Sequence, residues 1–128
     1  MDERDRHAEG MKIRRTVLGS AHVAAAEARK DSFTEPFQDL ITRYAWGEVW
    51  SRPGLSRHSR SLIVLATLVA LNRNDEFRMH VRAAIGNKVT REEIQEVLLQ
   101  SAIYCGVPAA NAAFHIAQQV FAEIDAQS

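Results

Sequence analysis

Residues 90–108, TREEIQEVLLQSAIYCGVP, combine a helix start, a helix body, a stop and a second start. Thr90 and Glu93 have the spacing of a capping box, in which the threonine hydroxyl accepts from the Glu93 amide and the carboxylate accepts from the Thr90 amide. Gly106 then ends the predicted helix, and Pro108 opens the next one. Because no strand pattern competes elsewhere, the sequence predicts an all-α domain.

Outside this stretch, proline, glycine and capping residues divide the chain into further helices. The predicted helices span residues 2–18, 20–29, 34–50, 58–71, 75–85, 90–105 and 108–124. Gly19 ends the first helix and Ser20 caps the second, and both of these helices are expected to be peripheral. Thr34 is predicted to cap the third helix, and Pro53 and Gly54 break the chain after it.

Two predicted helices have distinctive apolar patterns. The helix over residues 34–50 carries Phe37, Leu40, Ile41 and Tyr44 at helical spacing. Residues 62–71, LIVLATLVAL, are apolar on nearly every side, so their helix is predicted to lie at the buried centre of the domain or of an oligomer. This run is too short to span a bilayer.

Length and composition favour a single domain over residues 1–128. The chain is 46% hydrophobic and 25% charged, which suffices for one core without metals or disulfides. Its 16 basic residues balance 16 acidic ones, which argues against nucleic-acid binding and leaves self-association open. The charged start, MDERDRHAEGMKIRR, lacks the apolar segment of a secretory leader, so we expect a cytoplasmic protein without membrane contact.

The predicted helix over residues 75–85 places titratable groups beside an apolar stripe. The stripe consists of Phe77, Val81, Ala84 and Ile85, and it includes His80. Steps of four and then three residues back lead to Glu76 and Arg73, so an imidazole, a carboxylate and a cation share one edge if the helix reaches Arg73. A carboxylate beside His80 favours the charged imidazole and prepares it to donate a proton. The alternative interpretation is a core histidine beside an ordinary helix ion pair.

Aromatic and basic side chains are concentrated between residues 43 and 60. Trp46 and Trp50 are one turn apart, and Arg57 and Arg60 follow the Pro-Gly break. Arginine binds carboxylates in a planar, bidentate manner, so arginines beside an indole face can hold a small polycarboxylate. The alternative is that the tryptophans fill the core while the arginines lie in solvent.

The predicted helix over residues 90–105 carries polar residues along one side, a polar line that consists of Glu96, Gln100 and Tyr104. This polar line predicts a cavity that these residues border, a contact between subunits or a partly solvated face. Cys105 is the only cysteine, so no disulfide or dithiol pair can form, and it is interpreted as a small packed residue. No metal is predicted, because metal-ligand spacing is absent around His7, His22 and His58.

Three long strings carry a specific resemblance. They are Ala45–Leu55 (AWGEVWSRPGL), Leu68–Arg73 (LVALNR) and Ala102–Phe114 (AIYCGVPAANAAF). In these strings, and over nearly the whole chain from Gly10 onward, the sequence resembles the carboxymuconolactone decarboxylase family. The resemblance implies the alkylhydroperoxidase D-like fold, an all-helical domain of six to seven helices, and a ring-shaped homo-oligomer, often a hexamer.

Redox relatives in that fold carry Glu, Cys-x-x-Cys and His in a fixed pattern. On this sequence the cysteine positions fall at Arg73 and Glu76, the histidine at His80 and the glutamate at Ser61. The missing thiols argue against peroxide chemistry. The retained histidine, with Arg73 and Glu76, implies a site that has been converted to acid–base catalysis and carboxylate binding.

The resemblance also implies a reaction, the decarboxylation of 4-carboxymuconolactone to 3-oxoadipate enol-lactone and carbon dioxide. This step belongs to the protocatechuate branch of the β-ketoadipate pathway, and the substrate is a lactone with two carboxylates. The absence of a cofactor is predicted only from this resemblance. The candidate catalytic residues are His80, Glu76 and Arg73, and the candidate substrate-binding residues are Arg57, Arg60 and Trp46. Two alternatives remain: a peroxide-reducing protein that uses Cys105, and a non-catalytic helical oligomer that acts as a binding module.

Overall fold

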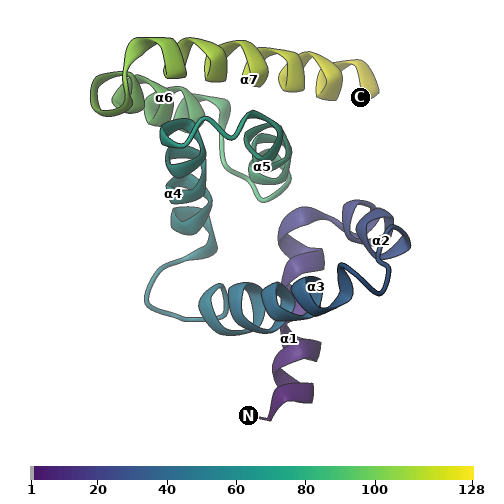
Figure 1. Ribbon diagram of the computed structural model, residues 1–128. Helices are drawn as coiled ribbons and strands as arrows, with labels where there is room; N and C mark the ends of the chain where they lie inside the picture. Colours follow the sequence, from purple (N-terminus) through teal and green to yellow (C-terminus); the bar gives the residue numbers. More distant parts are fainter. Residues whose placement is uncertain (1) are drawn as a thin grey trace. The chain divides into compact units, whose positions relative to one another are not determined.

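The computed structural model describes residues 2–128, and its regular elements are helices (Figure 1). In chain order they are α1 (Glu3–Leu18), α2 (Ser20–Ala28), α3 (Glu35–Ile41), η1 (Thr42–Val49), α4 (Arg57–Ala70), α5 (Asn74–Gly86), α6 (Arg91–Cys105) and α7 (Val107–Gln127). The described residues form no strand, so the predicted all-α class is confirmed. Among these helices, none combines the length and the apolar character needed to cross a membrane.

The chain divides into two compact units. The N-terminal unit ends at Arg57 and contains α1, α2, α3 and η1, and the C-terminal unit, His58–Ser128, contains α4 to α7 apart from the first residue of α4. Each unit has buried apolar residues of its own. The single domain over residues 1–128 stays a prediction.

In the N-terminal unit, α1 packs across η1 (Figure 1). Ile13 and Val17 of α1 are buried, as are Val23 of α2 and the two tryptophans of residues 46 and 50. The expectation that the first two helices are peripheral is therefore wrong. Although most residues of α1 are charged or polar, its few apolar side chains recur at helical spacing and face η1.

A buried arginine of α1 contacts the three other helices of this unit. The Arg14 guanidinium of α1 donates to Gln38 Oε1 at 3.1 Å and to Thr42 Oγ1 at 3.5 Å, and it lies 3.7 Å from a Glu27 carboxylate oxygen. Burial lowers the pKa of Arg14, and the Glu27 charge opposes that shift. The arginine thus ties α1 to α2, α3 and η1 through polar contacts inside the unit.

The predicted helix over residues 34–50 is two elements, the α-helix α3 and the π-helix η1. Trp50 N donates to Ala45 O at 2.9 Å, the five-residue step of a π-helix. None of the α3 residues is buried, and the side chains of Phe37 and Leu40 are 59% and 49% exposed. Residue spacing alone does not distinguish a π-helix from the α-helix that precedes it.

The C-terminal unit has one continuous core, and α7 lies along α6 and α5 (Figure 1). The largest buried side chains are Leu65, Phe77, Val81, Ile94, Leu98 and Val120. The buried residues of α4 are Ser61, Leu65 and Val69, whereas Ile63 of this helix is 52% exposed and Leu71, directly after it, is 64% exposed. The prediction that this helix forms the buried centre of the domain or of an oligomer stays a prediction.

The helix ends show which capping signals were correct. The Thr90–Glu93 capping box is present with both of its hydrogen bonds, and Gly106 ends α6 with a φ of 102°. Ser20 is the first residue of α2 and not its cap, because Gly19 occupies that position with a φ of 93°. Thr34 precedes α3 without a capping bond, because its hydroxyl accepts from the Asp31 amide instead.

Candidate functional site

Two of the predicted catalytic residues meet at the start of α5. Arg73 is the N-cap of this helix, with φ −95° and ψ 76°, so the helix does not extend to the arginine as the stacking prediction required. Its side chain nevertheless reaches forward, and Nη2 donates to Glu76 Oε1 at 3.0 Å. The predicted cation–carboxylate pair therefore exists, with its cation outside the helix.

The charges around Glu76 keep it ionised. The hydrogen bond from Arg73 is the largest cause that lowers the pKa of the Glu76 carboxyl, and a backbone hydrogen bond at the helix start and the charge of His80 act in the same direction. The same pair raises the pKa of Arg73. The anionic carboxylate thus lies within electrostatic range of His80, one helical turn further along α5.

His80 lies half-buried at the edge of the core stripe. Phe77 and Val81, its neighbours along the stripe, are 1% and 0% exposed, and Ala84 is buried as well. Ile85, which was also predicted for the stripe, is only half-buried. His80 is therefore partly accessible, as a histidine that exchanges a proton with a bound molecule has to be.

An open hollow of about 340 Å³ lies at the turn between α4 and α5, and Asn72, Arg73, Asn74, Asp75 and Glu76 line it. Asn72 has a φ of 56°, a left-handed conformation that asparagine tolerates better than most residues. The Arg73 guanidinium supplies the hollow's positive charge. His80 does not line this hollow, so a molecule that reached both residues would extend beyond it.

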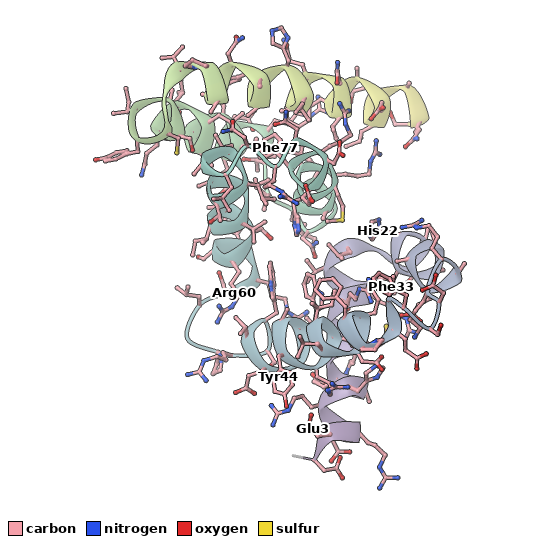
Figure 2. The ribbon with its side chains drawn as sticks, in the orientation of Figure 1. Glu3, His22, Phe33, Tyr44, Arg60 and Phe77 are labelled. Atoms are coloured by element: carbon pink, nitrogen blue, oxygen red, sulfur yellow. The ribbon has the colours of Figure 1, made fainter. Side chains whose placement is uncertain are left out.

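Arg57 and Arg60 both lie in the first turn of α4. Arg57 is exposed, and Arg60, labelled in Figure 2, is half-buried. Between these arginines lies His58, which contacts a residue far along the chain and was not predicted as a site residue from the sequence. His58 Nε2 lies 2.9 Å from Glu93 Oε2 on α6. A pairing between two helices more than thirty residues apart leaves no spacing signal in a single sequence.

Trp46 belongs to the N-terminal unit, where it is 7% exposed. Its ring centroid lies 5.0 Å from that of Trp50, with the planes tilted by 33°. The predicted one-turn spacing thus gives a tilted ring pair within the N-terminal unit. A contact of Trp46 with substrate stays a prediction.

The polar line on α6 borders a groove of about 290 Å³ between α4 and α6. Gln100 and Tyr104 of that line face it, together with Ser101 and Cys105, whereas Glu96 is an exposed residue outside the lining. Among residues 2–128, no three His, Cys, Asp or Glu side chains gather as possible metal ligands.

With this geometry established, comparison with known proteins places the chain among enzymes of one helical family. The family model of the carboxymuconolactone decarboxylase family matches residues 35–119. The match covers most of the chain, which therefore belongs to this family.

Three individual relatives illustrate this similarity. The 4-carboxymuconolactone decarboxylase of Acinetobacter baylyi is 48% identical over 124 residues, which cover 97% of this chain and 92% of that protein. The nitrosuccinic acid decarboxylase npaB of Metarhizium robertsii is 45% identical over 111 residues, 87% of this chain and 78% of that protein. A 4-carboxymuconolactone decarboxylase of Pseudomonas putida is 46% identical over 48 residues, 38% of this chain and 100% of that sequence.

Proposed function

We propose that this chain is a carboxy-lyase that converts 4-carboxymuconolactone to 3-oxoadipate enol-lactone and carbon dioxide, in the protocatechuate branch of the β-ketoadipate pathway. The observation that carries the proposal is the 48% identity, over nearly the full length of both chains, to a protein named for this activity. The Arg73–Glu76 pair beside a half-buried His80 supplies groups suited to the chemistry.

The reaction needs no external electron acceptor. When the bond between the ring carbon and its carboxylate breaks, the electron pair moves through the ring double bond into the lactone carbonyl. The resulting dienolate takes a proton at the ring carbon next to that carbonyl, which gives the enol-lactone. The protein has to hold the remaining carboxylate, stabilise the developing oxyanion and deliver one proton.

The fungal relative supports the same substrate class. Nitrosuccinic acid, named in that relative's description, also has two carboxyl groups and an electron-withdrawing group on the carbon beside one of them. Both molecules thus pair a carboxylate that leaves with a carboxylate that stays. A site for such dianions requires cations, and Arg73, Arg57 and Arg60 are the candidates in this chain.

The proposed roles follow from the placement of each group. His80 donates the proton or a hydrogen bond to the oxyanion, and the ionised Glu76 orients it. Arg73, together with Arg57 or Arg60, binds carboxylate, and Trp46 supplies an apolar wall. No cofactor enters this scheme.

We further propose that the protein is a homo-oligomer, with a hexamer as the expected form. Large apolar side chains that are exposed in the C-terminal unit support association between copies. They are Ile63, Leu71, Leu99, Ile103, Tyr104 and Val107. The cytoplasmic location stays a prediction from the sequence.

Incubation with 4-carboxymuconolactone tests the proposed activity, with carbon dioxide release and enol-lactone formation followed together. Equal amounts of both products are expected, without added metal or cofactor. Nitrosuccinate serves as the comparison substrate under the same conditions. Intact, folded protein that produced neither product from the lactone would contradict the proposal and favour the binding-module alternative.

A further inference from the structure

The first turn of α4 is joined to the first turn of α6 by an ion pair outside the proposed catalytic group. His58 Nε2 lies 2.9 Å from Glu93 Oε2, with the two side chains 40% and 39% exposed. The second oxygen of the carboxylate, Oε1, accepts from Thr90 N at 2.8 Å. Because one carboxylate oxygen contacts α4 and the other accepts from the N-cap residue of α6, the orientation of the Glu93 side chain is fixed.

The position of this carboxylate is electrostatically favourable. Glu93 is the third residue of α6 and contacts the second residue of α4, so its negative charge lies close to the N-terminal ends of two helices. The Thr90 backbone amide is the largest cause that lowers the pKa of Glu93, and the hydrogen bond with His58 acts in the same direction. The carboxylate is therefore charged and available to the imidazole at neutral pH.

The first turn of α4 contains no fully buried residue. Residues 51–57 are all exposed, and the first buried residue of α4 is Ser61, more than one turn into the helix. Arg57 and Arg60 lie within this turn, on either side of His58 in the sequence. Any displacement of the turn moves both guanidinium groups, and bidentate binding of a carboxylate tolerates little displacement.

We propose that His58 and Glu93 are positioning residues for carboxylate binding: their ion pair holds the first turn of α4, and with it Arg57 and Arg60, in the place where these arginines bind the substrate. The inference rests on the proposed function, which gives the two arginines their ligand. His58 and Glu93 themselves do not contact the reacting atoms. Their effect is therefore on substrate affinity and not on the chemical step.

Steady-state kinetics of His58→Ala and Glu93→Gln with 4-carboxymuconolactone test this inference. We expect KM to rise about tenfold in each variant while kcat stays within about twofold, the pattern produced when an interaction shared by ground state and transition state is lost. His58→Arg keeps a hydrogen-bond donor within reach of Glu93 and should restore KM to near the wild-type value. A purely structural role would lower the melting temperature without this selective change in KM.

Two controls separate positioning from general loss of stability. Glu123→Gln breaks an ion pair of similar length and exposure between α5 and α7, 2.8 Å from Arg82, and should leave KM unchanged. Thr90→Ala removes the hydroxyl from the capping box without removing His58 or Glu93, and should lower the melting temperature with little change in KM.

The outcomes distinguish the two proposals. Wild-type turnover combined with an unchanged KM in folded His58→Ala would overturn the positioning role alone. A KM increase of the same size in Glu123→Gln, or a failure of His58→Arg to recover, would overturn it as well. Absence of lactone turnover in the wild-type protein would instead overturn the proposed function and remove the basis of this inference.

Discussion

Gly10 of α1 and Gly47 of η1 pack backbone against backbone where the two helices cross. A Cβ atom on Gly10 would lie 2.9 Å from Gly47 N and even closer to the Thr42 carbonyl oxygen. A Cβ atom on Gly47 would lie 3.1 Å from Arg6 Cγ and closer still to the Arg6 carbonyl oxygen. The close approach of α1 and η1 therefore depends on the missing side chain of each glycine.

Replacement of either glycine should separate the two helices of the N-terminal unit. We expect Gly10→Ala and Gly47→Ala each to lower the free energy of unfolding by about 1–3 kcal/mol, the usual cost of overpacking against backbone that cannot yield. Urea unfolding measures the change. Gly86→Ala is the matched control, because nothing lies within 4 Å of the added Cβ in α5, and it should stabilise by about 0.5–1 kcal/mol. A wild-type midpoint for both Gly10→Ala and Gly47→Ala would contradict the packing argument.

The role proposed for His80 predicts a large kinetic effect with an intact fold. His80→Ala should reduce kcat on 4-carboxymuconolactone by about 10²–10³, the range for loss of one preorganised donor to a developing oxyanion. The exposed His115 on α7 provides the control, since His115→Ala should retain wild-type kcat. Circular dichroism checks that both variants are folded. A wild-type rate in His80→Ala would exclude the assigned role.

Several features of the fold follow from local sequence chemistry. The capping box at Thr90 and the glycine stop at Gly106 were predicted at the positions observed, because each depends on hydrogen bonds within a few residues. The pairing of Arg73 with Glu76 was predicted for the same reason, although the arginine lies outside the helix. Interactions over three or four residues can be recognised in a single sequence.

Long-range contacts could not be predicted in this way. The burial of Arg14 depends on Gln38 and Thr42, side chains that spacing does not connect to it. The same holds for His58 and Glu93, and for the contact of Gly10 with Gly47, whose signal is only a glycine in the interior of a predicted helix. The few apolar residues of α1 recur at helical spacing, but that spacing does not identify η1 as the element against which they pack.

The ionised state of Glu76 gives a pH prediction. Its pKa is lowered in the folded protein, chiefly by Arg73, so its contribution to stability is present above the ordinary carboxyl pKa of 4.5 and is lost as the pH falls. Acid titration of the melting temperature should therefore show a smaller loss in Glu76→Gln than in wild type. Arg73→Ala should reproduce the smaller loss, and identical acid profiles in all three proteins would contradict the pairing.

Replacement of Cys105 tests whether the protein acts by decarboxylation or by thiol chemistry. The cysteine lines the groove between α4 and α6, and a second thiol is absent from the sequence. Cys105→Ser should therefore retain the wild-type kcat and KM for the lactone, because neither the proposed proton donor nor the carboxylate-binding groups change. Peroxide consumption is measured in parallel on both proteins. Consumption by the wild type that disappears in Cys105→Ser would support the peroxide-reducing alternative.

His22 in α2 makes the stability of the N-terminal unit depend on pH in the opposite direction to a histidine whose pKa is raised by an ion pair. Burial is the largest cause that lowers its pKa below the ordinary value of 6.5, and the charges of Arg14 and Arg29 add to the shift. The unfolded chain therefore binds a proton that the folded chain resists, so the free energy of unfolding falls as the pH decreases through 6.5 and levels off below the folded pKa.

The matched variant for this prediction is His22→Gln, which keeps a polar side chain of similar reach without a titratable group. Urea unfolding at about pH 7.5, 6.5 and 5.5 should show a steeper loss of stability in the wild type than in the variant. The other histidines are present in both proteins, so the difference between the two slopes reports His22 alone. Parallel slopes, or a steeper slope in His22→Gln, would show that the folded unit accepts the imidazolium and that its neighbours, Arg14 included, do not oppose the charge.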